Sequence, residues 1–154
     1  MAILQIGAGG VGWVLAHKLA QNNDVFGDIV LASRTAAKAD RIVESIHRKN
    51  CLRVRDRTIT TREVNADDVA SLCRLIHEAK PKLVVNAGPP WVNVAVMEAC
   101  CRMRTSYLDT SVATDLCSPG QQVRRPTTRS GRTVIGSGSW ASPASSARGS
   151  TRVS

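Results

Sequence analysis

The sequence predicts an α/β domain built on a doubly wound parallel sheet, and three observations support this prediction. Short runs of β-forming residues alternate with segments of helical periodicity, and this alternation occurs five times. The first of the short runs is mainly apolar and ends at glycines, as expected of a parallel strand that is buried on both faces. A glycine-rich turn follows the first run directly. Alternation of this kind places crossover helices on both faces of a parallel sheet.

Five strands are predicted in this domain. They cover residues 2–6, 28–33, 58–64, 83–87 and 106–110. The third run has the smallest apolar content, so its sequence favours a strand less strongly than the others do. Pro81 stands before the fourth run and marks a point that the preceding helix cannot pass.

Four helices are predicted between these strands, three of them from apolar stripes at i, i+3 and i+4 spacing. The stripes are Val11, Val14, Leu15 and Leu19; Ala39, Ile42, Val43 and Ile46; and Val69, Leu72, Cys73 and Ile76. The fourth helix is expected over residues 92–103. All three histidines fall within these helices, away from the strand ends, so no catalytic role is expected for them.

Composition excludes several classes of protein. The net charge of +9 is concentrated at the end of the chain, because six of the 21 Lys and Arg and none of the 12 Asp and Glu follow residue 123. Residues 1–123 therefore carry only +3, and a nucleic-acid partner is not expected. Five cysteines without a CxxC pair predict reduced thiols and no metal site. The absence of a basic leader and of a long apolar run predicts a cytoplasmic protein without a membrane partner.

A GxGxxG motif links the first predicted strand to the first helix, where it predicts a Rossmann-type dinucleotide site. Gly7 permits the tight turn, Gly9 lets the backbone approach a pyrophosphate, and Gly12 lets the helix pack closely. Gly10 and Val11 complete the motif, and free amides at the helix start would face the anion. The alternative is a glycine turn that only closes the joint between strand and helix.

The end of the second strand predicts NADP(H) in preference to NAD(H). An NAD site places Asp or Glu there for the ribose hydroxyls, whereas this chain has Ser33, Arg34 and Thr35, followed by Lys38. A guanidinium can bind a 2′-phosphate with two hydrogen bonds, and a neighbouring hydroxyl can donate another. The alternative is that Arg34 is a solvated residue at the start of a helix.

Two further strand ends supply candidate cofactor contacts. After the third strand, Asn65 and Asp67 stand where an adenine ring would lie, although Asp67 or Asp68 could equally be the N-cap of the next helix. After the fourth strand come small residues that suit a backbone close to a ligand: Asn86, Ala87 and Gly88. Trp91 follows, either beside the nicotinamide or as an aromatic anchor of the next helix.

With these segments in hand, the chain resembles the saccharopine dehydrogenase family, and within it the carboxynorspermidine synthase branch. The most specific runs are NAGPPW at 86–91 and SYLDTS at 106–111. The resemblance covers residues 1–123 almost continuously and implies that the glycine turn holds the pyrophosphate and that residues 33–35 hold the 2′-phosphate. It also implies that residues 86–88 flank the ribose and nicotinamide, with Asp109, Thr110 and Ser111 near the cleft floor.

The activity implied by the resemblance is an NADPH-dependent reductive condensation. A diamine and aspartate semialdehyde form an imine, which hydride reduces to a secondary amine. A lysine-pathway relative that forms or cleaves saccharopine is the alternative. Small-molecule substrates and a homo-oligomeric parent enzyme are implied. The catalytic residues are unknown, because family members continue into a substrate domain that this sequence does not contain.

Residues 124–154 are expected to form a separate, disordered tail after a cofactor domain of residues 1–123. The tail has six Arg, eight Ser and no Lys, Asp, Glu or Leu, so it offers little apolar surface for a core. Restoring one base near codon 124 can recover a family-like helix and a sixth strand ending in GAGFDPG. We therefore expect a one-nucleotide deletion there, the loss of the sixth strand, and a chain that is a non-catalytic cofactor-binding fragment.

Overall fold

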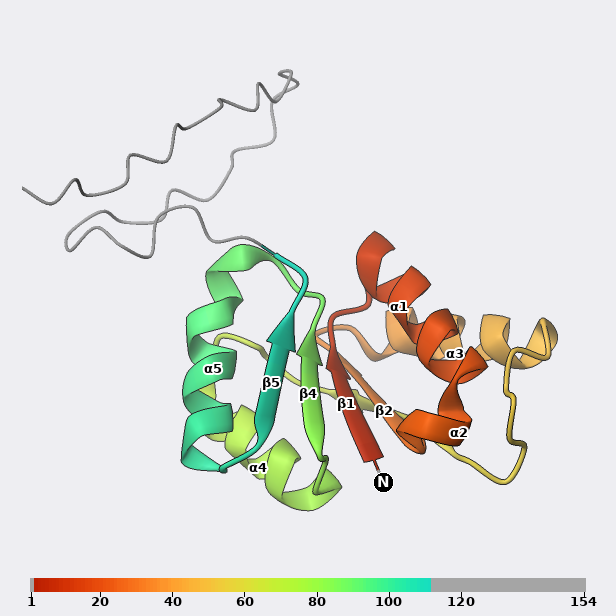
Figure 1. The fold of residues 1–154 in the computed structure, drawn as a ribbon. Helices are drawn as coiled ribbons and strands as arrows, with labels where there is room; N and C mark the ends of the chain where they lie inside the picture. Colours follow the sequence, from red (N-terminus) through yellow and green to blue (C-terminus); the bar gives the residue numbers. More distant parts are fainter. Residues whose placement is uncertain (1, 112–154) are drawn as a thin grey trace, which may run out of the picture. The chain divides into compact units, whose positions relative to one another are not determined.

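A computed structural model describes residues 2–111, which form a parallel sheet of five strands in the order β3-β2-β1-β4-β5 (Figure 1). The strands are β1 (Ala2–Ile6), β2 (Asp28–Ser33), β3 (Ile59–Glu63), β4 (Leu83–Asn86) and β5 (Ser106–Asp109). Every strand pair is parallel. The predicted Rossmann-type fold is therefore confirmed, and all five predicted strands are present to within one residue at each end.

Helices cover both faces of the sheet, as Figure 1 shows. The helices α1 (Gly10–Gln21) and α3 (Ala36–Arg48) pack on one face, and α4 (Val69–Ala79) and α5 (Asn93–Arg102) pack on the other. Two short elements were not predicted: α2 (Asn23–Phe26) and the 3₁₀ helix η1 (Pro90–Val92). Each face has its own apolar core, the first around Ile3, Ile29 and Leu31 and the second around Leu4, Ile6 and Val84.

The register of the sheet brings the functional turns to one edge. Ile6, the last residue of β1, pairs with Ala32 of β2 and with Asn86 of β4. Asn86 pairs in turn with Asp109, the last residue of β5. Because parallel strands end at the same side of a sheet, the chain segments that follow β1, β2, β4 and β5 lie next to one another there.

The predicted buried stripe of α1 is half correct. Leu19 is buried and Leu15 packs against the core, but Val11 and Val14 are 58% and 59% exposed, and the other buried residues of the helix are Gly12, Ala16 and Ala20. The physical reason is the close approach of the start of this helix to the glycine turn, which leaves no room for a large side chain at Gly12. Periodicity alone favoured the larger apolar residues, although the small residues have the same spacing.

The remaining helix predictions hold in outline. Buried residues in α3 include Ala39, Ile42 and Ile46, and those in α4 are Leu72, Leu75 and Ile76. The three histidines lie within α1, α3 and α4 as expected. The chain divides into two units, residues 1–124 and residues 125–154. The second unit, with the predictions of a tail and of a lost sixth strand, lies outside the described residues.

Among residues 2–111 there is no helix that is long and apolar enough to cross a membrane. The described cysteines are all free thiols, and burial raises the pKa of the Cys100 thiol to about 11. The same part of the chain contains no cluster of His, Cys, Asp and Glu that could hold a metal ion.

Candidate cofactor site

A cleft of about 330 Å³ opens at the carboxyl ends of the strands. This volume lies in the range of about 300–1,000 Å³ that is typical of small-molecule sites. Segments after β1, β2, β3 and β4 all contribute to it. The lining residues that were predicted to bind a cofactor are Gly7, Gly9, Gly10, Val11, Ser33, Arg34, Thr35, Lys38, Ala87 and Gly88.

The glycine turn is built so that side chains are excluded at two positions and space is left at two others. Gly7 has φ +105°, and a Cβ there would lie 2.8 Å from the backbone of Ala87. A Cβ at Gly12 would lie 2.2 Å from the carbonyl oxygen of Gly7. By contrast, a Cβ at Gly9 or Gly10 meets nothing within 4 Å, because both face the open cleft. The turn is therefore closely packed at Gly7 and Gly12 and open to the cleft at Gly9 and Gly10.

The first turn of α1 presents unpaired amides to this opening. The first bond of the helix runs from the amide of Trp13 to the carbonyl of Gly9 at 2.8 Å, so the preceding amides of the helix have no acceptor within it. No side chain caps the start of α1, and its first turn has no acidic residue. The helix dipole and these amides together favour an anion such as a pyrophosphate.

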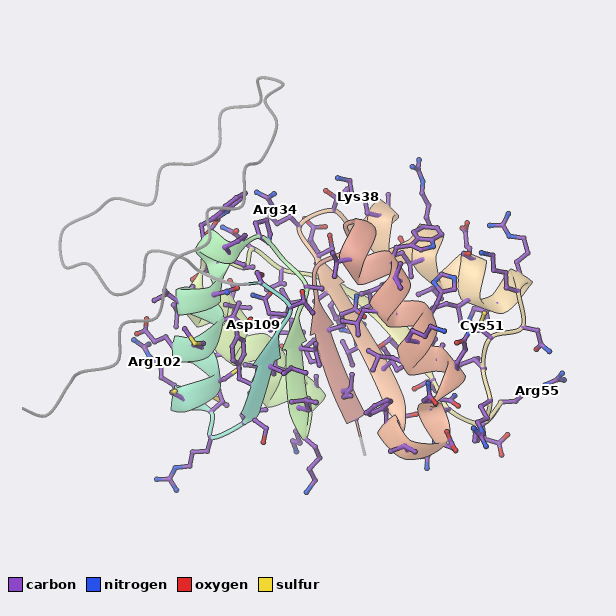
Figure 2. All side chains as sticks on the ribbon, turned by 45° about the horizontal axis from the view of Figure 1, so that its top comes forward. Arg34, Lys38, Cys51, Arg55, Arg102 and Asp109 are labelled. Atoms are coloured by element: carbon purple, nitrogen blue, oxygen red, sulfur yellow. The ribbon has the colours of Figure 1, made fainter. Side chains whose placement is uncertain are left out.

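Positive charge gathers at the end of β2. Arg34 and Lys38 are both exposed, and Figure 2 shows them at the same edge of the molecule. Neither takes part in an ion pair within the described region, and no Asp or Glu lines the cleft. The hydroxyl oxygen of Ser33 accepts a hydrogen bond from the amide of Thr35 at 3.3 Å, which leaves the hydroxyl hydrogen free to donate. The site therefore suits a phosphate better than a neutral ribose hydroxyl.

The predicted polar contacts after β3 do not line the cleft. Asn65 and Asp67 are exposed outside it, and the walls at this point are Val64 and Ala66. The N-cap of α4 is Asp68, whose carboxylate accepts a hydrogen bond from the amide of Ala70 at 3.0 Å. An adenine ring at this position would therefore contact apolar walls. Roles for Asn65 and Asp67 in binding remain predictions.

Asn86 is also absent from the cleft wall, because its side chain belongs to a buried polar network behind it. The amide nitrogen of Asn86 donates to Asn93 at 2.7 Å, and its side-chain oxygen accepts from the amide of Gly88 at 2.9 Å. Asn93 donates in turn to the carboxylate of Asp109 at 3.5 Å, which also accepts from the hydroxyl of Tyr107 at 3.1 Å. These bonds hold the turn after β4 against the end of β5.

Further hydrogen bonds of this network join the turn after β5 to the turn after β4. The hydroxyl of Ser111 donates to the carbonyl of Gly88 at 3.2 Å, and the amide of Thr110 donates to the carbonyl of Asn86 at 3.1 Å. Burial, assisted by the neighbouring Asp109 carboxylate, raises the pKa of Tyr107 to about 12. The phenol therefore stays protonated at neutral pH and keeps its bond to Asp109.

Two contributors were missed by sequence reasoning. Gln5 lies within β1, where strand periodicity marks only a buried position, yet its side chain contacts the glycine turn. Asn93 lies at the start of α5. Its side chain comes within hydrogen-bond distance of Asp109 only because β4 and β5 pair in the sheet. Trp91 lines the cleft and also packs on the core, and its place beside the nicotinamide stays a prediction.

Comparison with known proteins agrees with this geometry. Residues 3–144 match the family described as the saccharopine dehydrogenase NADP binding domain. A carboxynorspermidine synthase from Vibrio cholerae is 66% identical over 123 residues, which are 80% of this chain and 30% of that enzyme. A carboxyaminopropylagmatine dehydrogenase from Synechocystis is 36% identical over 109 residues, covering 71% of this chain and 25% of that enzyme. The chain therefore spans less than a third of the length of these relatives.

Solved structures show the same fold. A saccharopine dehydrogenase (L-Glu forming) from Saccharomyces cerevisiae superposes with a TM-score of 0.57 at 17% identity, over 74% of this chain and 22% of that one. A dTDP-glucose 4,6-dehydratase from Bacillus anthracis in complex with NAD gives a TM-score of 0.55 at 16% identity, over 71% of this chain and 36% of that one.

Proposed function

Because this chain belongs to the saccharopine dehydrogenase NADP-binding domain family, we propose that its cleft binds NADPH in preference to NADH, with the 2′-phosphate on Arg34. The observation that carries the proposal is a pair of cations, Arg34 after β2 and Lys38 at the start of α3; among residues 2–111 they form no ion pair, and no carboxylate lines their cleft. Lys38 adds a second positive charge, and the Ser33 hydroxyl is free to donate. The Thr35 hydroxyl completes the phosphate contacts.

The remaining contacts follow the course of the cleft. The open backbone at Gly9, Gly10 and Val11 would hold the pyrophosphate, and Gly7 and Gly12 would shape the turn beneath it. Ala87 and Gly88 would flank the ribose and nicotinamide, with Asn86 fixing their turn from behind. The bound cofactor supplies hydride; the residues described here orient it and contribute positive charge to the site.

The experiment is a calorimetric titration of the 154-residue chain with NADPH and with NADH. It is carried out on the wild type and on Arg34→Ala. Loss of charge-assisted hydrogen bonds to a phosphate, each of about 1.5–3 kcal/mol, should raise the NADPH dissociation constant by about tenfold or more. Affinity for NADH should change less than twofold. Arg55→Ala is the matched control, because Arg55 is exposed and does not line the cleft. Equal affinity of the wild type for both cofactors would refute the preference.

We also propose that the full-length enzyme condenses aspartate semialdehyde with a diamine in an NADPH-dependent reduction. The 66% identity to a carboxynorspermidine synthase supports this substrate class over the glutamate and aminoadipate semialdehyde of the lysine-pathway relatives. Restoring the full reading frame and assaying NADPH oxidation with each substrate pair tests it. Oxidation with the lysine-pathway pair alone would contradict the proposal. The number of subunits can be measured on the same enzyme by light scattering.

The 154-residue chain itself is proposed to bind the cofactor without turnover. The titratable side chains that line the described cleft are Arg34, after β2, and Lys38, in the first turn of α3, so the described residues place no carboxyl, imidazole, thiol or phenol group in the cleft wall beside Ala87 and Gly88. Mixing the chain with NADPH, aspartate semialdehyde and putrescine should leave the absorbance at 340 nm constant. A steady decrease that depends on all three components would show that this proposal is wrong.

Residues 124–154 are proposed to be the product of a one-nucleotide deletion near codon 124. The match to the Vibrio cholerae enzyme is 123 residues long, the same length as the predicted cofactor domain, which supports the hypothesis, whereas the family match continues to residue 144. Sequencing codons 120–156 in several independent clones tests the hypothesis. A uniform locus in which no single-base restoration encodes family-like residues would contradict it.

A further inference from the structure

Gln5 is a polar side chain in the centre of β1, and it is completely buried. Its strand neighbours in the sheet are Leu31 and Val85, which are both apolar and buried. The amide nitrogen donates to the carbonyl of Gly12 at 2.8 Å and to the carbonyl of Gly7 at 3.0 Å. The two hydrogens of one amide group therefore join the glycine turn to the first turn of α1.

The amide oxygen of Gln5 is buried without a hydrogen-bond partner. An unpaired buried acceptor carries a desolvation cost that an apolar residue would avoid. The opposite orientation of the amide would place this oxygen against two carbonyl oxygens, so the two acceptors determine its orientation. The presence of Gln at this position is thus explained by the two bonds that it donates, and not by packing.

The bonds to Gly7 and Gly12 also set the direction of two amides. In a trans peptide the carbonyl and the following N–H point in opposite directions, and the described chain has no cis peptide. Holding the Gly7 carbonyl down towards Gln5 therefore turns the amide of Ala8, a residue of the cleft wall, away from the core. Holding the Gly12 carbonyl orients the amide of Trp13, which makes the first bond of α1.

We propose that Gln5 is a positioning residue for the pyrophosphate-binding turn, and that the amide of Ala8 is one of the donors it holds in place. Gln5 itself touches no ligand, because the turn lies between it and the cleft. Preorganised amides bind an anion without the cost of ordering a glycine-rich loop. This inference rests on the proposed binding of NADPH, and its test separates the two.

The first experiment compares Gln5→Met with the wild type in the full 154-residue chain. Methionine has a similar length and no amide hydrogens, so the turn loses both bonds. The dissociation constant for NADPH should rise about tenfold, equivalent to ~1.4 kcal/mol. Adenosine 2′-phosphate, which carries the phosphate for Arg34 and no pyrophosphate, should change less than twofold. Ile3→Val is the matched control, because it removes a buried methyl group from the same face of β1 without touching the turn.

A loss of affinity that is the same for both ligands would overturn the inference, because it would indicate a general structural defect. Unchanged NADPH binding in Gln5→Met would also overturn it. If the wild-type chain binds no NADPH, the proposed function fails. Backbone exchange then decides the role of Gln5: faster exchange at Ala8 and Trp13 in the variant, with α3 unchanged, supports it, and equal exchange overturns it.

A second measurement uses the wild type and does not depend on how the variant folds. Both side-chain amide hydrogens of Gln5 are donated within the core, whereas the side chain of Gln21 is exposed. In nuclear magnetic resonance spectra of the chain, the side-chain amide of Gln5 should exchange with solvent at least 100-fold more slowly than that of Gln21. Comparable exchange rates for the two side chains would show that the bonds to the turn are absent.

Discussion

Replacement of Gly12 by alanine tests the close packing of α1 against the glycine turn. The new Cβ would lie 2.2 Å from the Gly7 carbonyl oxygen and 2.9 Å from its carbon. The contacted atoms are backbone, so no side-chain rotation can relieve the overlap, and the helix must move away by roughly 1 Å. Such a shift would lengthen the bond from Gln5 to the carbonyl of Gly12, now 2.8 Å, beyond ordinary hydrogen-bond length.

The magnitude follows from these contacts. Overpacking of this kind costs about 1–3 kcal/mol. The lost hydrogen bond adds about 1 kcal/mol, and the better helix propensity of alanine offsets up to ~1 kcal/mol. We therefore expect Gly12→Ala to lower the free energy of unfolding by about 1–3 kcal/mol, a sizeable part of the roughly 5–15 kcal/mol that is usual for a domain.

Urea unfolding followed by far-UV circular dichroism measures this loss. The matched control is Gly10→Ala, two residues earlier in the same helix, where a Cβ meets nothing within 4 Å. That variant should be unchanged or stabilised by up to ~1 kcal/mol, because alanine is the better helix former. Equal stability of the two variants would refute the close contact between α1 and the turn.

Two further predictions concern other elements. Tyr107 is the chain's single tyrosine, so the absorbance change of phenol ionisation reports on it alone; the native midpoint should lie near pH 12 and return to about 10 in urea. Because its folded pKa is raised, the stability it contributes is complete below pH 10 and is lost as the pH rises towards 12, and a native midpoint of 10 would contradict the burial of this hydroxyl. On α1, Leu19→Ala should cost about 2–4 kcal/mol and Val14→Ala less than ~0.5 kcal/mol in the same unfolding assay, because only Leu19 is buried. A larger loss for Val14→Ala would restore the stripe predicted from periodicity.

The positions of the strands, and the edge of the sheet where the cofactor residues lie, were predictable for physical reasons. Buried parallel strands need mainly apolar runs, and the run before Gly7, apart from Gln5, and the run before Ser33 supply them. Once those strands pair in parallel, their carboxyl ends share one edge, so the placement of Gly9 and Arg34 on one cleft follows from chain order alone.

Other features were not predictable because they depend on contacts between distant segments. The face of α1 is decided by its approach to Gly7, and periodicity cannot weigh that approach against the size of Val11 and Val14. The exposure of Asn65 follows from the course of the chain between β3 and α4, where its side-chain oxygen accepts a hydrogen bond from the amide of Asp67. A polar residue next to a strand end was a reasonable ligand candidate, but its side-chain direction is a tertiary property.

By itself, the sequence determined the parallel α/β architecture, the glycine turn and the positive charge of the cofactor site, because each depends on local pattern and chain order. Only the tertiary structure decided which side chains hold that site in shape. Gln5 and Asn93 act through hydrogen bonds to residues on other elements or across a tight turn. Such bonds depend on how closely the helices pack on the sheet, and close packing is a property of the folded chain as a whole.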